Sequence, residues 1–106
     1  MKITISGKNI DVTQALRSVT EDKLAKLEKY FTADAECIVT LSVEKERQKM
    51  EVTIPMKGHI IRAEQQSDDM YVTIDLVVDV IEAQLKKYRK KLITKQQNSD
   101  SLRKEF

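Results

Sequence analysis

The sequence has few of the residues that cross-link, stack or interrupt a protein chain. Its 106 residues include one cysteine, one histidine, one proline, two glycines and no tryptophan. A single cysteine cannot form an internal disulfide, which excludes a disulfide-rich secreted scaffold. No spacing typical of a metal site, a phosphate-binding glycine loop or a catalytic nucleophile occurs. We therefore expect a protein that is not an enzyme and that holds no metal and no cofactor.

Long apolar segments are also missing. No run approaches the roughly 18 residues that a membrane-spanning helix requires, and the N-terminus lacks the apolar core of a signal peptide. Hydrophobic residues nevertheless make up 41% of the chain, which is too apolar for a disordered protein. A chain of this length fits one domain. The composition therefore predicts a single soluble domain in the cytoplasm, without a membrane partner.

Hydrophobic periodicity predicts a β-α-β-β-β-α order. Alternating apolar and polar residues indicate strands, and apolar residues at i+3 and i+4 spacing indicate helices. A first strand joined to the second through a helix lies parallel to it, and three consecutive strands form an antiparallel meander. This predicts an α+β fold, a four-stranded mixed sheet with two helices packed on one face. The predicted strands cover residues 2–6, 36–44, 50–57 and 59–66, the helices 13–31 and 67–95, a charged loop 45–49, and a polar linker or frayed tail 96–101.

Some local details follow from single residues. Asp11 and Thr13 are both candidates to cap the first helix. Cys37 belongs to the inward-facing set of its strand, whereas Ile38 is an apolar exception on the outer face. Pro55 cannot donate a ladder hydrogen bond, which places it at a sheet edge, a bulge or a strand end.

The net charge of +2 hides an uneven distribution. Residues 1–85 carry 11 basic and 15 acidic side chains, whereas residues 86–106 carry 8 basic and 2 acidic ones. Within the second predicted helix, residues 67–85 hold five acidic side chains and no basic one. The helix macrodipole favours this polarity, and a solubilising tail is the alternative explanation. Six clustered cations repel one another more than the dipole offsets, which points to an anionic partner; they are Lys86, Lys87, Arg89, Lys90, Lys91 and Lys95.

The first predicted helix carries a second set of cations. Lys23, Lys26 and Lys29 recur at i, i+3 and i+6 and form one ridge; a solvated face with ion pairs is the alternative. If the helices pack side by side, Lys23 and Lys26 face Lys87 and Lys91 across a groove that would neutralise a phosphate backbone. Aromatic residues make up only 5% of the chain, which predicts recognition of shape and phosphate rather than of bases.

Seven stretches, collinear over residues 1–92, carry a resemblance to a known family; they are Ile5–Ile10, Val12–Arg17, Lys23–Phe31, Glu51–Pro55, Arg62–Glu64, Asp68–Tyr71 and Ile74–Leu76. They resemble the ribosome hibernation promoting factors, a family that includes protein Y. The resemblance implies a fold similar to a double-stranded-RNA-binding domain. It also implies binding to the small ribosomal subunit, with its 16S-type rRNA, at the decoding centre. Occupying the sites of tRNA and mRNA there would inhibit translation and store idle ribosomes during stress or stationary phase.

The resemblance assigns the rRNA contacts to basic side chains of both helices. The family commonly has arginine before the Gln84–Leu85 pair, and this chain has Ala83 there, which puts one phosphate contact in doubt. Together with the lysine ridge, the expected rRNA-binding residues are Lys23, Lys26, Lys29, Lys87, Arg89 and Lys91.

The end of the chain resembles the start of the linker in long family members. We expect residues 1–95 to form the ribosome-binding domain and residues 96–106 to be a polar tail or the start of a linker. This ending favours the N-terminal piece of a long member over a short-form protein. In long members a small C-terminal domain follows and joins two ribosomes, so ribosome dimerisation is expected only with such a domain. The alternative functions are a protein-interaction module that modulates a sigma factor and a general double-stranded-RNA binder.

Overall fold

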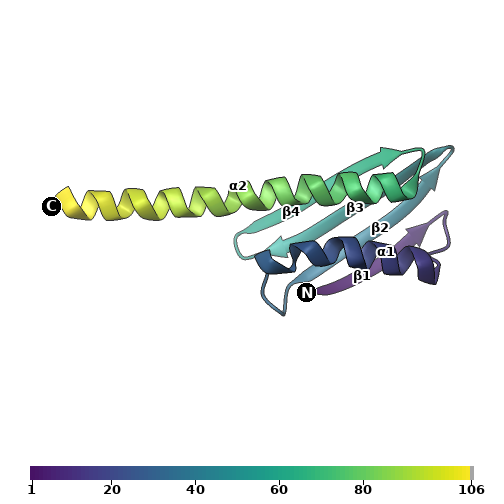
Figure 1. The fold of residues 1–106 in the computed structure, drawn as a ribbon, viewed down its shortest axis with the longest axis horizontal. Coiled ribbons are helices and arrows are strands. Elements are labelled where there is room, and N and C mark those ends of the chain that lie inside the picture. Colours follow the sequence, from purple (N-terminus) through teal and green to yellow (C-terminus); the bar gives the residue numbers. More distant parts are fainter. Residues whose placement is uncertain (106) are drawn as a thin grey trace.

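Four strands form one mixed sheet, and the helices cover one of its faces. The computed structural model describes the backbone of residues 1–105 and the side chains of residues 1–89. Figure 1 shows the elements in their spatial arrangement. They are β1 (Lys2–Lys8), α1 (Gln14–Leu24), the 3₁₀ helix η1 (Ala25–Tyr30), β2 (Glu36–Glu44), β3 (Arg47–Met56), β4 (His59–Ser67) and α2 (Met70–Glu105).

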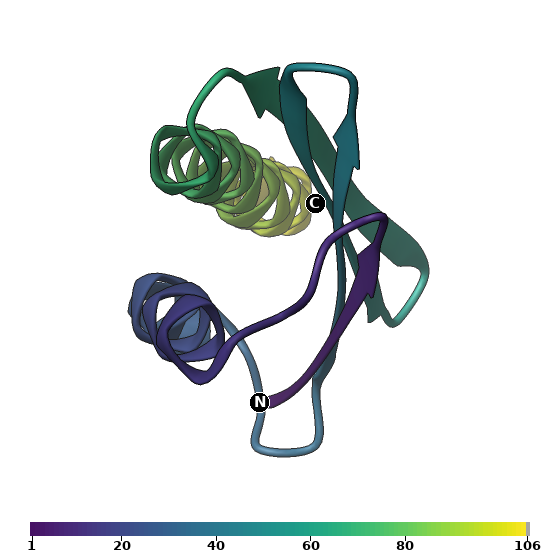
Figure 2. The same ribbon diagram turned by 90° about the vertical axis from the view of Figure 1, so that its right-hand side faces the viewer.

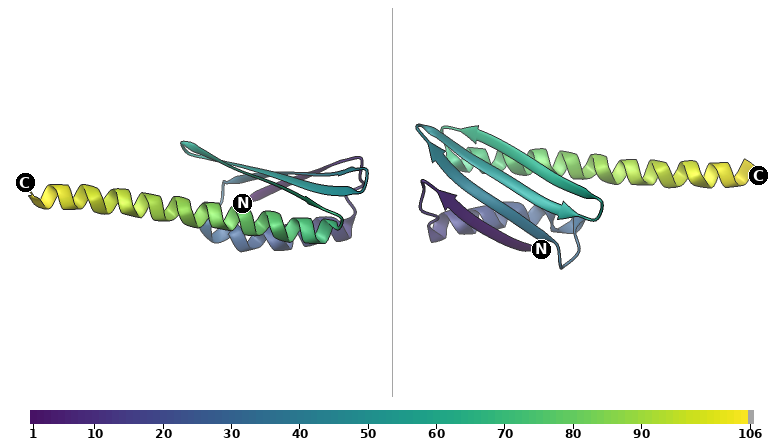
Figure 3. Two further views of the ribbon diagram at one scale, coloured as in Figure 1. Left: turned by 90° about the horizontal axis from the view of Figure 1, so that it is seen from above. Right: turned by 180° about the vertical axis from the view of Figure 1, so that it is seen from behind.

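The sheet has the predicted topology. Its strand order is β1-β2-β3-β4; β1 runs parallel to β2, and the other neighbours are antiparallel. Seen along the helices, α1 and α2 lie side by side on the same face (Figure 2), and the opposite face of the sheet carries no helix (Figure 3). Both helices begin at the same end of the sheet and run parallel to each other (Figure 1). The predicted α+β fold is therefore confirmed.

The structure shows which of the two candidate residues caps the first helix. The Thr13 hydroxyl accepts a hydrogen bond from the backbone N–H of Leu16 at 3.1 Å, so Thr13 and not Asp11 is the N-cap. The predicted helix 13–31 is α-helical only to Leu24 and continues as η1, whose tighter turns commonly finish an α-helix.

The charged segment 45–49 is not a loop, which corrects the prediction. Only Lys45 and Glu46 form the turn, and the β2–β3 ladder extends to the pair Glu44–Arg47. Lys45 adopts a left-handed backbone with φ 58°, which closes this short connection. Long charged side chains are accommodated in the ladder because they reach solvent at this end of the sheet. Pro55 lies at a strand end, beyond the last pair that β3 makes with β2.

The second helix is longer than predicted. It runs through the segment 96–101 to Glu105, and Figure 1 shows it extending well past the edge of the sheet. The physical reason is that no glycine or proline follows Gly58, so the sequence contains no residue that readily ends a helix.

The core fills the space between the sheet and the helices. Val39 and Val52 from the sheet, Leu24 from α1, and Ile74 and Ile81 from α2 are fully buried there. The predictions for the second strand are confirmed, since the Cys37 side chain is buried and Ile38 is 45% exposed. Within the described residues, no helix is long and apolar enough to cross a membrane.

Candidate nucleic-acid interface

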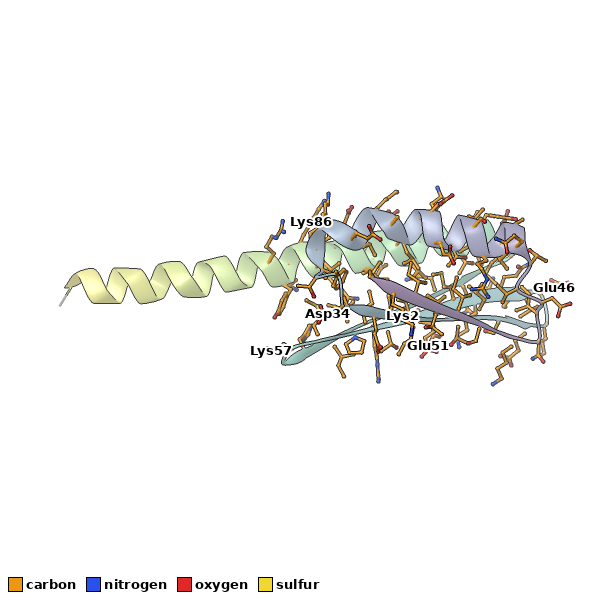
Figure 4. The ribbon with its side chains drawn as sticks, turned by 90° about the horizontal axis from the view of Figure 1, so that it is seen from below. Lys2, Asp34, Glu46, Glu51, Lys57 and Lys86 are labelled. Carbon is orange, nitrogen blue, oxygen red and sulfur yellow. The ribbon has the colours of Figure 1, made fainter. Side chains whose placement is uncertain are left out.

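The basic end of α2 is exposed where the helix leaves the sheet. Lys86, Lys87 and Arg89 are all solvent-accessible, and Figure 4 shows Lys86 on the helix side, pointing away from the sheet. The side chains of Lys90, Lys91 and Lys95, predicted to extend this cluster, lie outside the described residues. The part of the cluster that the structure describes is therefore open to a partner.

Lys23 contacts the acidic half of α2 rather than the basic half. Its ammonium nitrogen lies 3.1 Å from Oδ1 of Asp75, and both side chains are about half exposed (40% and 53%). This ion pair joins α1 to α2 near the start of α2. Because an exposed pair of this kind is worth little, its main consequence is that it partly neutralises Lys23.

Lys87 lies on a different side of α2. Together with Gln84 and Tyr88 it lines a hollow against Gly58 and His59 at the β3–β4 turn. The Gln84 amide donates a 2.9 Å hydrogen bond to the Arg62 carbonyl oxygen, which holds this flank against β4. Lys87 therefore faces the outer strand of the sheet and not α1.

These positions contradict the four-lysine groove. Asp75, which contacts Lys23, precedes Lys87 by twelve positions, which at about 100° per residue turns Lys87 about 120° around the helix. Lys91 follows Lys87 by one helical turn and shares its flank, although its side chain lies outside the described residues. The prediction was wrong because residue spacing gives the position of a side chain only relative to the apolar stripe of its own helix. It does not show which flank of α2 faces α1.

Cations from both helices do meet, at Tyr30. The Arg89 guanidinium carbon lies 5.1 Å from the centre of the Tyr30 ring, and the Lys29 ammonium lies 5.3 Å from it. An aromatic face attracts cations, so the ring holds two like charges near each other. Lys26 is exposed on the same 3₁₀ helix. We call Lys26, Lys29, Tyr30 and Arg89 the Tyr30 junction.

Sequence reasoning missed the rings at this end of the domain. His59 stacks on Tyr88 with ring centres 5.2 Å apart and planes 6° from parallel. The two residues come from different elements, so no spacing along the chain links them. The only available signal was the helical spacing that placed Tyr88 on the buried side of α2. The rings therefore gather beside Lys87 and the Tyr30 junction.

Cys37 is not a candidate nucleophile. Burial raises the pKa of its thiol to about 11, which keeps the sulfur uncharged at neutral pH. Among the described residues, no group of three or more histidine, cysteine, aspartate or glutamate side chains is placed to hold a metal ion. The chemistry that this surface offers is the binding of anions by fixed cations.

Comparison with known proteins identifies the family. Residues 3–93 match the family described as Sigma 54 modulation protein / S30EA ribosomal protein. The chain belongs to this family. The S30EA match covers the four strands, α1, η1 and α2 up to residue 93, so it includes the Tyr30 junction and the acidic half of α2. It confirms the resemblance that the sequence motifs indicated.

Two curated relatives of this S30EA member are named for ribosome hibernation. The ribosome hibernation promoting factor of Azotobacter vinelandii is 40% identical over 97 residues, which cover 92% of this chain and 91% of that protein. The ribosome hibernation promotion factor of Lactococcus lactis subsp. cremoris is 43% identical over 102 residues, 93% of this chain and 55% of that protein. The chain therefore spans nearly the full length of one relative and about half the length of the other.

Solved structures share the fold of this S30EA member. The N-terminal domain of Thermus thermophilus protein Y superposes with a TM-score of 0.76 at 32% identity, covering 83% of this chain and 99% of that one. A ribosomal subunit interface protein from Coxiella burnetii also gives 0.76, at 30% identity, covering 85% and 99%. Both structures contain the same arrangement of sheet and helices.

Proposed function

We propose that this domain is a cytoplasmic ribosome hibernation factor that binds the 16S-type rRNA of the small ribosomal subunit. Membership of the S30EA family and the names of the relatives support a role in hibernation. The structural observation that carries the proposal is the convergence of Lys29 and Arg89, from two different helices, on one tyrosine ring. Such a fixed pair of cations suits a phosphate backbone of defined shape.

The expected rRNA-binding residues take different roles in this proposal. Lys26, Lys29 and Arg89 at the Tyr30 junction bind one stretch of phosphates. Lys87, with Lys91 beyond it on the same flank, binds a second stretch on the side of the β3–β4 turn. Lys23 contributes less, because Asp75 already offsets its charge.

Inhibition in this proposal is steric. The domain binds near the decoding centre and occupies the places of tRNA and mRNA, so that a ribosome holding it cannot translate. No bond is made or broken, which agrees with relatives named for hibernation and not for a catalysed reaction. Release would require only that the electrostatic contacts be lost, as when the ionic strength rises.

The test is co-sedimentation of the chain with small ribosomal subunits at increasing salt. Contacts to about six phosphates would weaken binding by roughly 10³-fold or more between 50 and 200 mM salt. The absence of co-sedimentation at low salt would overturn the proposal. A gradient of whole ribosomes with the same chain shows whether ribosome pairs form, which we expect only when a C-terminal domain follows.

A matched pair of variants locates the interface. In the first, Lys26→Gln, Lys29→Gln and Arg89→Gln remove the cations of the Tyr30 junction; we expect weaker binding and a salt slope reduced by about two to three. In the control, Lys8→Gln, Lys45→Gln and Arg47→Gln remove three exposed cations at the other end of the sheet. Equal losses in the two variants would show that only net charge matters and would remove the junction from the mechanism.

The family description also contains sigma-54 modulation, which favours a protein-interaction module as the second candidate. Such a module would capture a protein partner from a nuclease-treated extract, whereas a ribosome-bound factor would lose its partner with the RNA. A general double-stranded-RNA binder would bind a free RNA duplex as tightly as it binds intact subunits.

A further inference from the structure

The solvent-facing side of α2 carries a row of apolar side chains. Val72, Leu76 and Ala83 are exposed and spaced by four and seven residues, which keeps them on one face of the helix, and Val80 between them packs partly against the core. Val72 is 47% exposed and Leu76 is 40% exposed, and Figure 2 shows no element covering this side of α2. We call Val72, Leu76 and Ala83 the apolar ridge. Single exposed apolar residues are ordinary, but a continuous row suggests a contact surface.

The opposite side of the same helical segment already forms the core. Ile74 and Val77 are fully buried against the sheet, and Val78 is 2% exposed. The apolar ridge is therefore not needed for packing within this domain. A helix that is apolar on two faces is typical of one buried on both sides, so the ridge leaves one face without a partner.

Acidic residues border the ridge. Asp75 and Asp79 are exposed one helical turn apart on its α1-facing side, and the exposed Asp68 comes just before the first residue of α2. Asp75 is paired with Lys23 on α1, whereas Asp68 and Asp79 form no ion pair with any of the described side chains. Because residues 67–85 contain no lysine or arginine, this half of α2 repels phosphate.

We propose that the apolar ridge and its acidic border bind a basic protein segment of the small ribosomal subunit that carries apolar side chains. The inference rests on the proposed function, which puts the domain on the ribosome. Proteins that bind rRNA must be basic to neutralise its phosphates, so the surfaces around this domain are either phosphate or basic protein. The acidic border excludes the first and attracts the second, and the apolar ridge supplies contact area that does not depend on salt.

The orientation of the domain follows from this division. Val72 and Leu76, the two large side chains of the ridge, lie near the start of α2, and Arg89 of the Tyr30 junction follows Val72 by seventeen positions along the helix. One end of the layer faces RNA and the other faces protein. A domain held at both ends has a single allowed direction on the subunit, which cations alone would not impose.

A photo-cross-linking experiment on the ribosome complex tests the proposal. A benzophenone amino acid replaces Val72 or Leu76 in one pair of chains and Ile38, 45% exposed on the open face of the sheet, in a control chain. After irradiation of the complex with small subunits, the adducts are digested with nuclease or with protease. We expect positions 72 and 76 to give nuclease-resistant adducts with a basic protein, at several times the yield of position 38.

The outcomes separate this inference from the function on which it rests. Nuclease-sensitive adducts at positions 72 and 76, or none, with co-sedimentation retained would overturn the inference alone. If the chain does not co-sediment at all, the proposed function fails and the inference fails with it.

A binding measurement adds a second criterion. Val72→Gln with Leu76→Gln should weaken small-subunit binding about tenfold while leaving the salt slope unchanged, because the lost contacts are apolar. Ile38→Gln with Ile60→Gln, two equally exposed apolar residues on the sheet, is the matched control and should leave the affinity unchanged. Equal effects of the two pairs, or a reduced salt slope in the first, would contradict a protein contact at the ridge.

Discussion

Cys37 shows how burial controls the chemistry of a single residue. Its side chain is completely buried on β2, and loss of solvation raises its thiol pKa from 9.0 to about 11. The thiol would therefore ionise in the unfolded chain at a lower pH than in the folded one. This difference links folding stability to alkaline pH.

We predict that wild-type protein loses stability relative to Cys37→Ala as pH rises from 9 to 11. Below pH 9 both states keep the thiol proton, so the difference is constant. Above pH 9 only the unfolded state releases it, so the free energy of unfolding falls, by up to about 2 kcal/mol at pH 11. Urea unfolding of both proteins at pH 8 and pH 10.5 measures the effect; parallel changes in the two would contradict it.

The cap of α1 gives a second prediction for a single residue. Thr13→Ala removes the acceptor of the Leu16 N–H bond and should lower the free energy of unfolding by about 1 kcal/mol. Asp11→Ala is the control, since the structure assigns it no capping bond, and should change stability by less than about 0.5 kcal/mol. Denaturant unfolding of both variants measures the two changes. A larger loss of stability in Asp11→Ala would show that Asp11, and not Thr13, caps the helix.

At the scale of an element, α2 combines a packed part with a projecting part. Its first five turns lie on the sheet, where Leu85 is the last side chain of the buried core. Tyr88, which stacks on His59, and Arg89, which contacts Tyr30, come three and four positions after Leu85. Beyond these, Figure 1 shows the helix backbone leaving the sheet.

We predict that a chain ending at Lys95 is as stable as the full chain. The backbone of residues 96–105 runs away from the sheet (Figure 1), so we expect their removal to change the free energy of unfolding by less than about 0.5 kcal/mol. A chain ending at Leu85 is the contrast, since it also loses the Tyr88 and Arg89 contacts and should be measurably less stable. Thermal melts decide, and a large loss for the first chain would move the domain boundary beyond residue 95.

The two helices also show which features a sequence can predict. Periodicity located α2 and its buried face, because burial of one stripe is encoded in the spacing of apolar residues. The flank that faces α1 was not predicted, because it depends on the strand order and on the hand of the β1-α1-β2 crossover. The Tyr30–Arg89 contact and the His59–Tyr88 stack depend on that same packing, so they too required the structure.

At the scale of the whole molecule, charge is divided along the helix layer. The acidic half of α2 lies over the sheet and the basic half lies where the helix leaves it, and both helices run in the same direction (Figure 1). The net charge of +2 is therefore the sum of an acidic end and a basic end of the molecule. A polyanion should approach from the basic end and be repelled from the other.

Neutralising the acidic end tests this picture. Asp68→Asn with Asp79→Asn should strengthen binding to a free RNA duplex several-fold at 50 mM salt, because phosphate is no longer repelled from the helix layer. Glu36→Gln with Glu51→Gln gives the same change in net charge on the open face of the sheet, where Figure 4 labels Glu51. Fluorescence anisotropy compares the pairs; equal strengthening would mean that net charge alone governs binding.

The parallel pairing of β1 has a consequence for how the molecule is made. β1 is an edge strand that pairs with β2 in the sheet. Lys2 therefore has a wait without its partner until Glu36, 34 positions later in the chain, has been synthesised. At roughly 5–20 residues per second of synthesis, that wait lasts about two to seven seconds. The hairpins from β2 to β4 close between neighbours, at a small entropic cost, and need no such delay. The first strand to emerge from a translating ribosome therefore remains without its partner for longer after its own synthesis than any other strand of the sheet.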